Sequence, residues 1–126
     1  MKLRFDKNSI RLRVKKSDLE ILKERHLLEE TIHFPNGELS FILSVSEENK
    51  EITATLQHST ITVMLPSGIA IPWMQNDEVG IYHTSSFNDN ILYIIVEKDF
   101  PCKDRSTDEN QDTFTELAEK DNAKSC

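Results

Sequence analysis

The side chains with the clearest capacity for chemistry are basic groups interleaved with apolar residues near the start of the chain. They are Arg4, Arg11, Arg13 and Lys15. Guanidinium groups form paired hydrogen bonds with carboxylates and phosphates, so these residues could bind an acidic protein or a small anion. The same charges could instead pair with carboxylates of the chain itself, such as Glu29 and Glu30. The sequence alone leaves both interpretations open.

The elements that must position these basic groups are two short strands. Apolar residues occupy every second position in each, as with Leu3 and Phe5 and again with Ile10 and Leu12. Because successive side chains of a strand point to opposite faces, this spacing predicts a hairpin with one apolar face and one basic face. Its turn is expected at residues 7–9.

Charge is divided unevenly along the chain. Residues 1–16 contain seven Lys or Arg and one acid, Asp6, whereas the whole chain has a formal net charge of −7, so residues 17–126 carry −13. A chain that is acidic overall, and whose basic hairpin lacks interleaved exposed aromatic residues, argues against a nucleic-acid partner.

Neither membrane insertion nor export is expected. No apolar run approaches the roughly 18 residues that span a bilayer. Charges interrupt the first residues, where a secretory signal would need an apolar block. The two cysteines, Cys102 and Cys126, do not make a disulfide framework. Together these features predict a cytoplasmic protein.

Metal and cofactor sites are not expected either. The chain has four histidines, which are His26, His33, His58 and His83. They fall on separate elements without the short spacing of structural zinc ligands. The three glycines do not cluster, so the sequence lacks a glycine-rich loop that could cradle the phosphates of a nucleotide cofactor.

A small-ligand or catalytic site at the mouth of a barrel is an alternative function. Its candidate residues are His58, His83, Asp99 and Cys102, which the fold would have to gather from distant segments. Carboxylates that follow a buried strand can act as acid and base, but charges at a strand end more often mark its exit to solvent. Trp73 could line such a pocket, although its apolar neighbours favour a place over the core.

Alternating patterns separated by turn residues predict further antiparallel hairpins. The clearest passes through Asn36-Gly37, because these residues tolerate the positive φ angles of tight hairpin turns. A second joins residues 52–56 to 61–65. Residues 91–96 form a continuous apolar run, which predicts a strand buried on both faces in the centre of the core.

Two short helices are predicted. Residues 17–20 fit a capping box ahead of a helix over residues 17–25, with Leu19 and Leu22 on its buried side. Residues 69–76 predict a second helix with Pro72 near its start, because proline lacks the backbone donor needed farther inside.

These elements predict one α+β domain over residues 1–102. We expect a mainly antiparallel, strongly bent sheet or small barrel of about eight strands with one or two short helices. No internal repeat is apparent. Residues 103–126 are acidic and poor in large apolar side chains, so we expect a largely disordered tail. The alternative for the tail is a docking helix with Phe114, Leu117 and Ala118 on one face.

Four segments of the chain have a recognisable sequence. They are Asn8-Ser-Ile-Arg-Leu-Arg13, Ser17-Asp-Leu-Glu20, Asp77-Glu-Val-Gly-Ile81, and Val96-Glu-Lys-Asp-Phe100 followed by Cys102. These segments resemble those of a family of small uncharacterised bacterial proteins, a domain of unknown function. The resemblance covers about residues 1–102 and implies a bacterial, cytosolic protein. It implies no activity, ligand or functional residue.

The sequence therefore predicts an uncharacterised, non-catalytic binding or adaptor module that uses its basic hairpin face on an anionic protein or small-molecule partner. The small-ligand or catalytic site described above is one alternative. The other is a self-associating structural component, in which an exposed sheet edge pairs with a second copy to form a homodimer.

Overall fold

The alternating segments fold into four hairpins. A computed structural model describes residues 1–100 and 112–118. The hairpins are β1 (Lys2–Asp6) with β2 (Ser9–Val14), β3 (Leu27–Phe34) with β4 (Gly37–Ser46), β5 (Thr53–Gln57) with β6 (Thr60–Pro66), and β7 (Gly80–Phe87) with β8 (Asn90–Lys98). The turn at Lys7 lies where the sequence predicts it, and Lys7 adopts a positive φ of 54°. The β3–β4 hairpin turns at Pro35-Asn36, and Gly37 begins β4, so neither Asn36 nor Gly37 has the positive φ that the prediction assumed.

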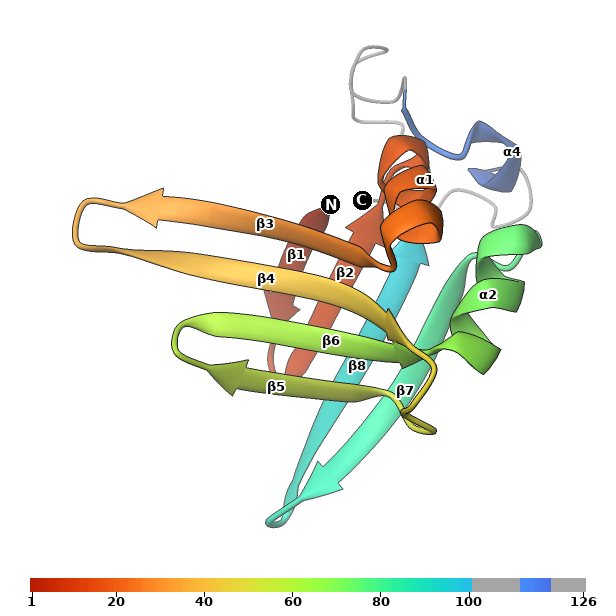
Figure 1. Cartoon of the computed structure of the whole chain (residues 1–126). Coiled ribbons are helices and arrows are strands. Elements are labelled where there is room, and N and C mark those ends of the chain that lie inside the picture. Colours follow the sequence, from red (N-terminus) through yellow and green to blue (C-terminus); the bar gives the residue numbers. More distant parts are fainter. Residues whose placement is uncertain (101–111, 119–126) are drawn as a thin grey trace.

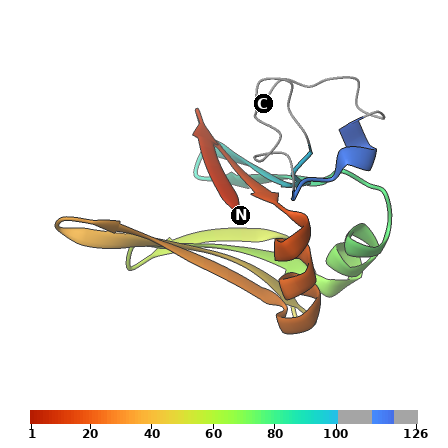
Figure 2. The same cartoon turned by 90° about the horizontal axis from the view of Figure 1, so that it is seen from above.

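The hairpins join in pairs to form two mixed four-stranded sheets. Sheet A has the order β1-β2-β8-β7 and sheet B the order β3-β4-β6-β5. The two central pairs, β2 with β8 and β4 with β6, are parallel, while the hairpin pairs are antiparallel. The predicted α+β class with eight strands is confirmed. The described strands form two bent sheets in separate layers rather than a closed barrel (Figure 2).

The two halves of the chain repeat one pattern of two strands, a helix and two strands. Each half contributes its first hairpin to one sheet and its second hairpin to the other. The two halves are therefore related by an approximate two-fold symmetry (Figure 1). Equivalent backbone bonds confirm the correspondence. Ser40 N donates to Ser59 O at 3.0 Å, and Tyr93 N donates to Asn8 O at 3.1 Å.

This structural repeat corrects the expectation that the chain has none. The halves share a pattern of buried positions rather than residue identities. For example, Leu12 and Leu22 in the first half correspond to Val63 and Trp73 in the second, and all four are buried. Apolar residues of different shape serve equally well at such positions, so the repeat leaves little trace in the sequence.

In each half of the chain, one helix connects the first hairpin to the second hairpin. The helix α1 (Lys16–Arg25) buries Leu19 and Leu22 as predicted. Its cap lies earlier than the predicted one, because Lys15 is the N-cap and its backbone N–H donates to Asp18 Oδ2 at 3.0 Å. The carboxylate of Asp18 thus satisfies one of the donors left over at a helix start.

The helix α2 (Ser67–Gln75) confirms the second predicted helix but corrects the place of its proline. Pro66 is the N-cap residue, and Pro72 lies inside the helix. Proline at an interior position removes one backbone hydrogen bond, which is tolerated here in a helix of nine residues. Trp73 is 1% exposed and donates its indole N–H to Val79 O, so it covers the core as expected.

The core lies between the facing sides of the two sheets and continues under α1 and α2. The β8 segment is central in sheet A as predicted, and Ile94 and Val96 are buried. The expected burial on both faces is wrong, because Tyr93 on the outward face is 50% exposed and Ile91 is 44% exposed. No helix among the described ranges 1–100 and 112–118 has both the length and the apolar character required to cross a membrane.

Part of the predicted tail packs on this core. Leu117 is buried in a short helix, α4 (Thr115–Ala118), and Phe114 is buried just before it. Phe114 N donates to Asp99 O at 2.7 Å. For Phe114 and Leu117 the docked alternative holds and a solvated terminus does not. The rest of the predicted disordered tail, residues 103–111 and 119–126, lies outside the described residues.

Candidate functional site: a lysine pocket between the helices

The structure keeps Arg4, Arg11 and Arg13 on the outward face of the first hairpin but exposes them to different extents. Arg4 is exposed and faces Arg11 across the first hairpin. Arg13 is only 9% exposed, and its guanidinium lies 5.1 Å from the centre of the Phe100 ring. Lys15 is half-buried at the start of α1. The three arginines therefore share the outward face of the hairpin but differ in exposure, with Arg4 exposed and Arg13 nearly covered, while Lys15 lies apart at the start of α1.

Two of these arginines pair with the chain's own carboxylate, Glu97. Arg11 Nε lies 3.1 Å from Glu97 Oε1, and Arg13 Nε lies 3.7 Å from the same oxygen. Glu97 is 2% exposed. Neither Glu97 Oε1 nor Arg13 Nε has an aligned hydrogen bond among the described atoms, so attraction between charges dominates this contact. Self-pairing, one of the two interpretations open from the sequence, therefore holds for Arg11 and Arg13.

Glu29 and Glu30 are not the carboxylates that pair with the arginines. Glu30 Oε1 instead lies 2.9 Å from the N-terminal ammonium of Met1. The parallel pairing of β2 with β8 instead places Arg13 opposite Glu97. Parallel neighbours come from distant parts of the chain, so local alternation could not indicate this pair.

The same pairing adds exposed aromatic residues to the arginine face. Tyr93 lies opposite Ser9 and is 50% exposed, and Tyr82 lies in the row of Arg11 and Ile95. The expected lack of aromatic residues on this face is therefore wrong. The acidic balance of the chain still argues against a nucleic-acid partner, which stays a prediction.

The alternative set of catalytic candidates is not brought together. His58 lies in the turn between β5 and β6, His83 in the middle of β7, and Asp99 beyond the far end of β8. Cys102 lies outside the described residues. Across residues 1–100 and 112–118, no group of three or more His, Cys, Asp or Glu side chains is placed to hold a metal ion.

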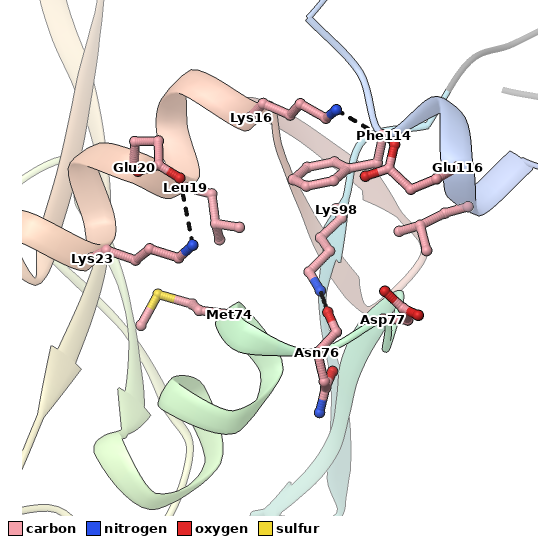
Figure 3. A pocket seen from close by; sticks show the side chains of 11 residues that line it. Lys16, Leu19, Glu20, Lys23, Met74, Asn76, Asp77, Lys98, Phe114 and Glu116 are labelled. Atoms are coloured by element: carbon pink, nitrogen blue, oxygen red, sulfur yellow. Dashed lines mark hydrogen bonds and ion pairs between the residues drawn. The ribbon is translucent and has the colours of Figure 1, made fainter.

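A different site lies between the three helices. It is a pocket of about 250 Å³ enclosed by α1, the end of α2 and the segment that carries α4 (Figure 3). Its charged walls come from Lys16, Glu20, Lys23, Asp77, Lys98 and Glu116, and its other lining residues are Leu19, Met74, Asn76, Phe114 and Leu117. We call it the lysine pocket.

Lys98, the last residue of β8, is the most unusual lining residue. It is 2% exposed because it continues the inward-facing series of Ile94 and Val96. Its ammonium donates a hydrogen bond of 2.6 Å to Asn76 O. The same nitrogen lies 5.5 Å from the Trp73 ring centre and 5.9 Å from that of Phe114.

Burial sets the protonation behaviour of Lys98. Desolvation disfavours the ammonium and lowers the pKa of Lys98 from its ordinary value of 10.5, while the negative charges of Asp77 and Glu78 offset part of this effect. A lysine with a lowered pKa in a pocket is a recognised mark of a functional site, although structural networks also produce it. Here the geometry and the pKa agree on the same residue.

The rim of the lysine pocket carries two exposed ion pairs. Lys23 Nζ lies 3.4 Å from Glu20 Oε1, and Lys16 Nζ lies 3.4 Å from Glu116 Oε2. A hydrogen bond from its own backbone, followed by the charge of Lys16, lowers the pKa of Glu116. Exposed pairs of this kind contribute about 0–1 kcal/mol, so a ligand can replace them at little cost.

The repeat supplies an internal comparison for Lys98. The corresponding position in the first half is Val45, because Val45 N bonds to His26 O as Lys98 N bonds to Val79 O. Val45 is buried in the core. The position therefore accepts an ordinary apolar residue, and the fold does not require a lysine there.

We expect replacement of Lys98 by Met to stabilise the chain, most of all at the low end of the range from neutral pH to 10.5. Folded Lys98 releases its proton at a lower pH than unfolded Lys98, so the unfolded state binds more protons within this window. The wild-type free energy of unfolding then rises with pH, and its deficit relative to Lys98→Met shrinks. Urea unfolding across this range measures the difference. Lys23→Met is the exposed control, and identical profiles for the two variants would contradict the expectation.

Sequence reasoning missed this pocket because Glu97-Lys98-Asp99 was interpreted as the exit of a strand to solvent. All three residues are buried, and Lys2 Nζ lies 3.1 Å from Asp99 Oδ2. The available signal was alternation: Lys98 follows Ile94 and Val96 on the inward face. The covering segment at Phe114 could not be placed from the pattern, since it follows a long polar stretch.

Comparison with known proteins adds a family to these observations. A model described as "Family of unknown function (DUF7009)" matches residues 1–117. The match extends beyond the predicted domain end at residue 102 and includes Phe114 and Leu117 of the lysine pocket. No curated protein and no solved structure matches the chain.

Proposed function

The chain belongs to DUF7009, a family of unknown function, and because membership assigns no activity, we propose from its lysine pocket that it is a non-catalytic binding protein for a small carboxylate ligand. The observation that carries the proposal is a buried lysine at the base of a pocket, where the equivalent half of the fold has Val45. A bacterial, cytoplasmic origin stays a prediction of the sequence.

The chemistry of the walls favours a carboxylate with an apolar body. An ammonium carries three hydrogen-bond donors, and among the described contacts Lys98 uses one of them on Asn76 O. A ligand carboxylate can accept a further hydrogen bond from the ammonium. Its negative charge also favours the protonated form of Lys98, which burial disfavours. Leu19, Met74 and Phe114 offer apolar contacts to the rest of the ligand.

The size and composition of the pocket favour binding over catalysis. A volume of about 250 Å³ lies just below the range of about 300–1,000 Å³ that is usual for small-molecule sites, which favours a small ligand. Its rim pairs hold the other two lysines beside carboxylates, so each can change partner when a ligand enters. No covalent step is needed for these groups to act.

Titration with benzoate tests the proposal. Benzoate joins a carboxylate to an apolar ring, and benzamide is its neutral counterpart of the same shape. We expect benzoate, but not benzamide, to shift amide NMR signals around Leu19, Asn76 and Lys98. In Lys98→Met the apparent affinity for benzoate, measured from these shifts, should fall at least tenfold, which is about 1.4 kcal/mol.

Lys7→Met provides the control, because Lys7 is an exposed lysine in a turn outside the pocket. This variant should bind benzoate as the wild type does. Equal binding of benzoate by Lys98→Met and the wild type would overturn the proposal, as would shifts confined to other surfaces.

The predicted anion-binding face remains a second candidate, now centred on Arg4. Arg4 and Arg11 line a hollow of about 80 Å³ with Asp6 and Ser9, on the outer side of the first hairpin. Inorganic phosphate in the same titration distinguishes the two sites. Shifts at Arg4 and Arg11 without shifts at Lys98 would favour the hairpin face.

A further inference from the structure

The ends of two long hairpins carry apolar side chains that the opposite sheet does not cover. The strands of the two sheets cross steeply, so the tip of β3–β4 projects to the left of sheet A and the tip of β7–β8 projects below sheet B (Figure 1). Phe34 and Phe87 lie at these tips and are 52% and 48% exposed.

These residues belong to the inward faces of the sheets. On β3, Ile32 and Phe34 lie on the same face as Leu28, which is buried in the core. On β7, Phe87 shares a face with buried Ile81. The inward faces therefore carry apolar side chains again at the tips, beyond polar Glu30 on β3 and beyond His83 and Ser85 on β7.

A groove between the two short hairpins exposes further apolar side chains. It has a volume of about 270 Å³, and Phe5, Ile10, Leu56 and Leu92 contribute apolar lining. Phe5 and Leu56 occupy equivalent positions in the two halves and are 57% and 73% exposed. The uncovered surface thus follows the approximate two-fold relation of the fold.

We infer that a second copy of this chain covers the hairpin tips and the groove. Within one chain, the inward face of one sheet is covered by the inward face of the other, because an apolar sheet face requires a second layer. The tips of another copy carry the same residue types at corresponding positions, such as Phe34 and Phe87. They can therefore supply the layer that is missing beyond the edge of the core.

The exposed area supports an interface between copies. Five large apolar side chains that are between 43% and 73% exposed present on the order of 500 Å² of apolar surface. They are Phe5, Ile32, Phe34, Leu56 and Phe87. These side chains lie at two tips and in one groove rather than in a single patch, so different parts of a partner would have to cover them (Figure 1). A standard interface buries about 800 Å² on each partner, so these side chains would form more than half of one.

Sedimentation of the full chain over a concentration series tests the inference. We expect a reversible dimer for the wild type and at least a tenfold weaker dimer for the double variant Phe34→Ser with Phe87→Ser. Tyr93→Ser is the matched control, because Tyr93 is similarly exposed, at 50%, on the outward face of β8. The control should dimerise as the wild type does.

Hydrogen exchange keeps the test decisive if the double variant folds poorly. In the wild type, amides around Phe34 and Phe87 should gain protection as concentration rises, while those beside Tyr82 on the outward side should not. A wild type that stays monomeric throughout the series would overturn the inference. So would a double variant that folds and dimerises normally, or dimers whose concentration-dependent protection lies on the outward face.

Discussion

Neither half of the chain is expected to fold alone, whereas the two halves together should restore the native structure. The cut lies between residues 48 and 49, in the connection between β4 and β5. Each fragment keeps its hairpins but loses the parallel partner of each, since β2 pairs with β8 and β4 pairs with β6. Isolated two-stranded hairpins are marginal at best in water. Circular dichroism and amide NMR of separate and mixed fragments measure the effect.

A full-length chain with a protease site inserted at this connection provides the control. Before cleavage it should give the wild-type spectrum, and after cleavage the fragments should remain associated until a denaturant separates them. The repeat allows one fragment to pair with a second copy of itself, so a folded dimer of one fragment agrees with the pairing. A folded monomer of either fragment would contradict it.

Removal of the buried Glu97 carboxylate is expected to destabilise the chain by about 3–5 kcal/mol, because it leaves Arg13 buried beside Arg11 without their common counter-charge. Urea unfolding of Glu97→Ala measures this loss. The exposed Glu29→Ala is the control and should change the free energy of unfolding by less than about 0.5 kcal/mol.

The repeat also predicts how to restore stability. The positions of Arg11, Arg13 and Glu97 correspond to Thr62, Met64 and Ser44 in sheet B. A chain with Arg11→Thr, Arg13→Met and Glu97→Ser should therefore match or exceed the wild type, since replacing a whole buried charge cluster is often neutral or stabilising by about 1–4 kcal/mol. If the triple variant is as unstable as Glu97→Ala, the two halves do not tolerate exchange of these residues.

The sequence predicted the elements that depend on local pattern. Alternation defined the hairpins, including the β3–β4 hairpin, and the apolar run at residues 91–96 identified the central strand β8. The α1 helix was predicted from its apolar spacing. The two-sheet arrangement was harder to predict, because it depends on parallel pairings between β2 and β8 and between β4 and β6, far apart in the chain.

The candidate site was less predictable than the fold. A basic residue on an alternating strand indicates a face, but the role of Arg13 depends on which strand lies beside it, and Glu97 could not be identified as its neighbour. The burial of Lys98 depends on the segment at Phe114, which follows a long polar stretch of the chain. Local composition carries little information about contacts of that kind.

The exchange of hairpins between the halves also determines the order in which the two sheets can form during synthesis. All four strands of sheet B lie between residues 27 and 66, so this sheet can assemble while the ribosome still holds the remainder. Sheet A joins the first strands to leave the ribosome with β8, among the last. The β1–β2 hairpin is therefore synthesised well before β8, and its apolar face stays exposed until β8 pairs with it. During this period a chaperone can bind the hairpin most readily.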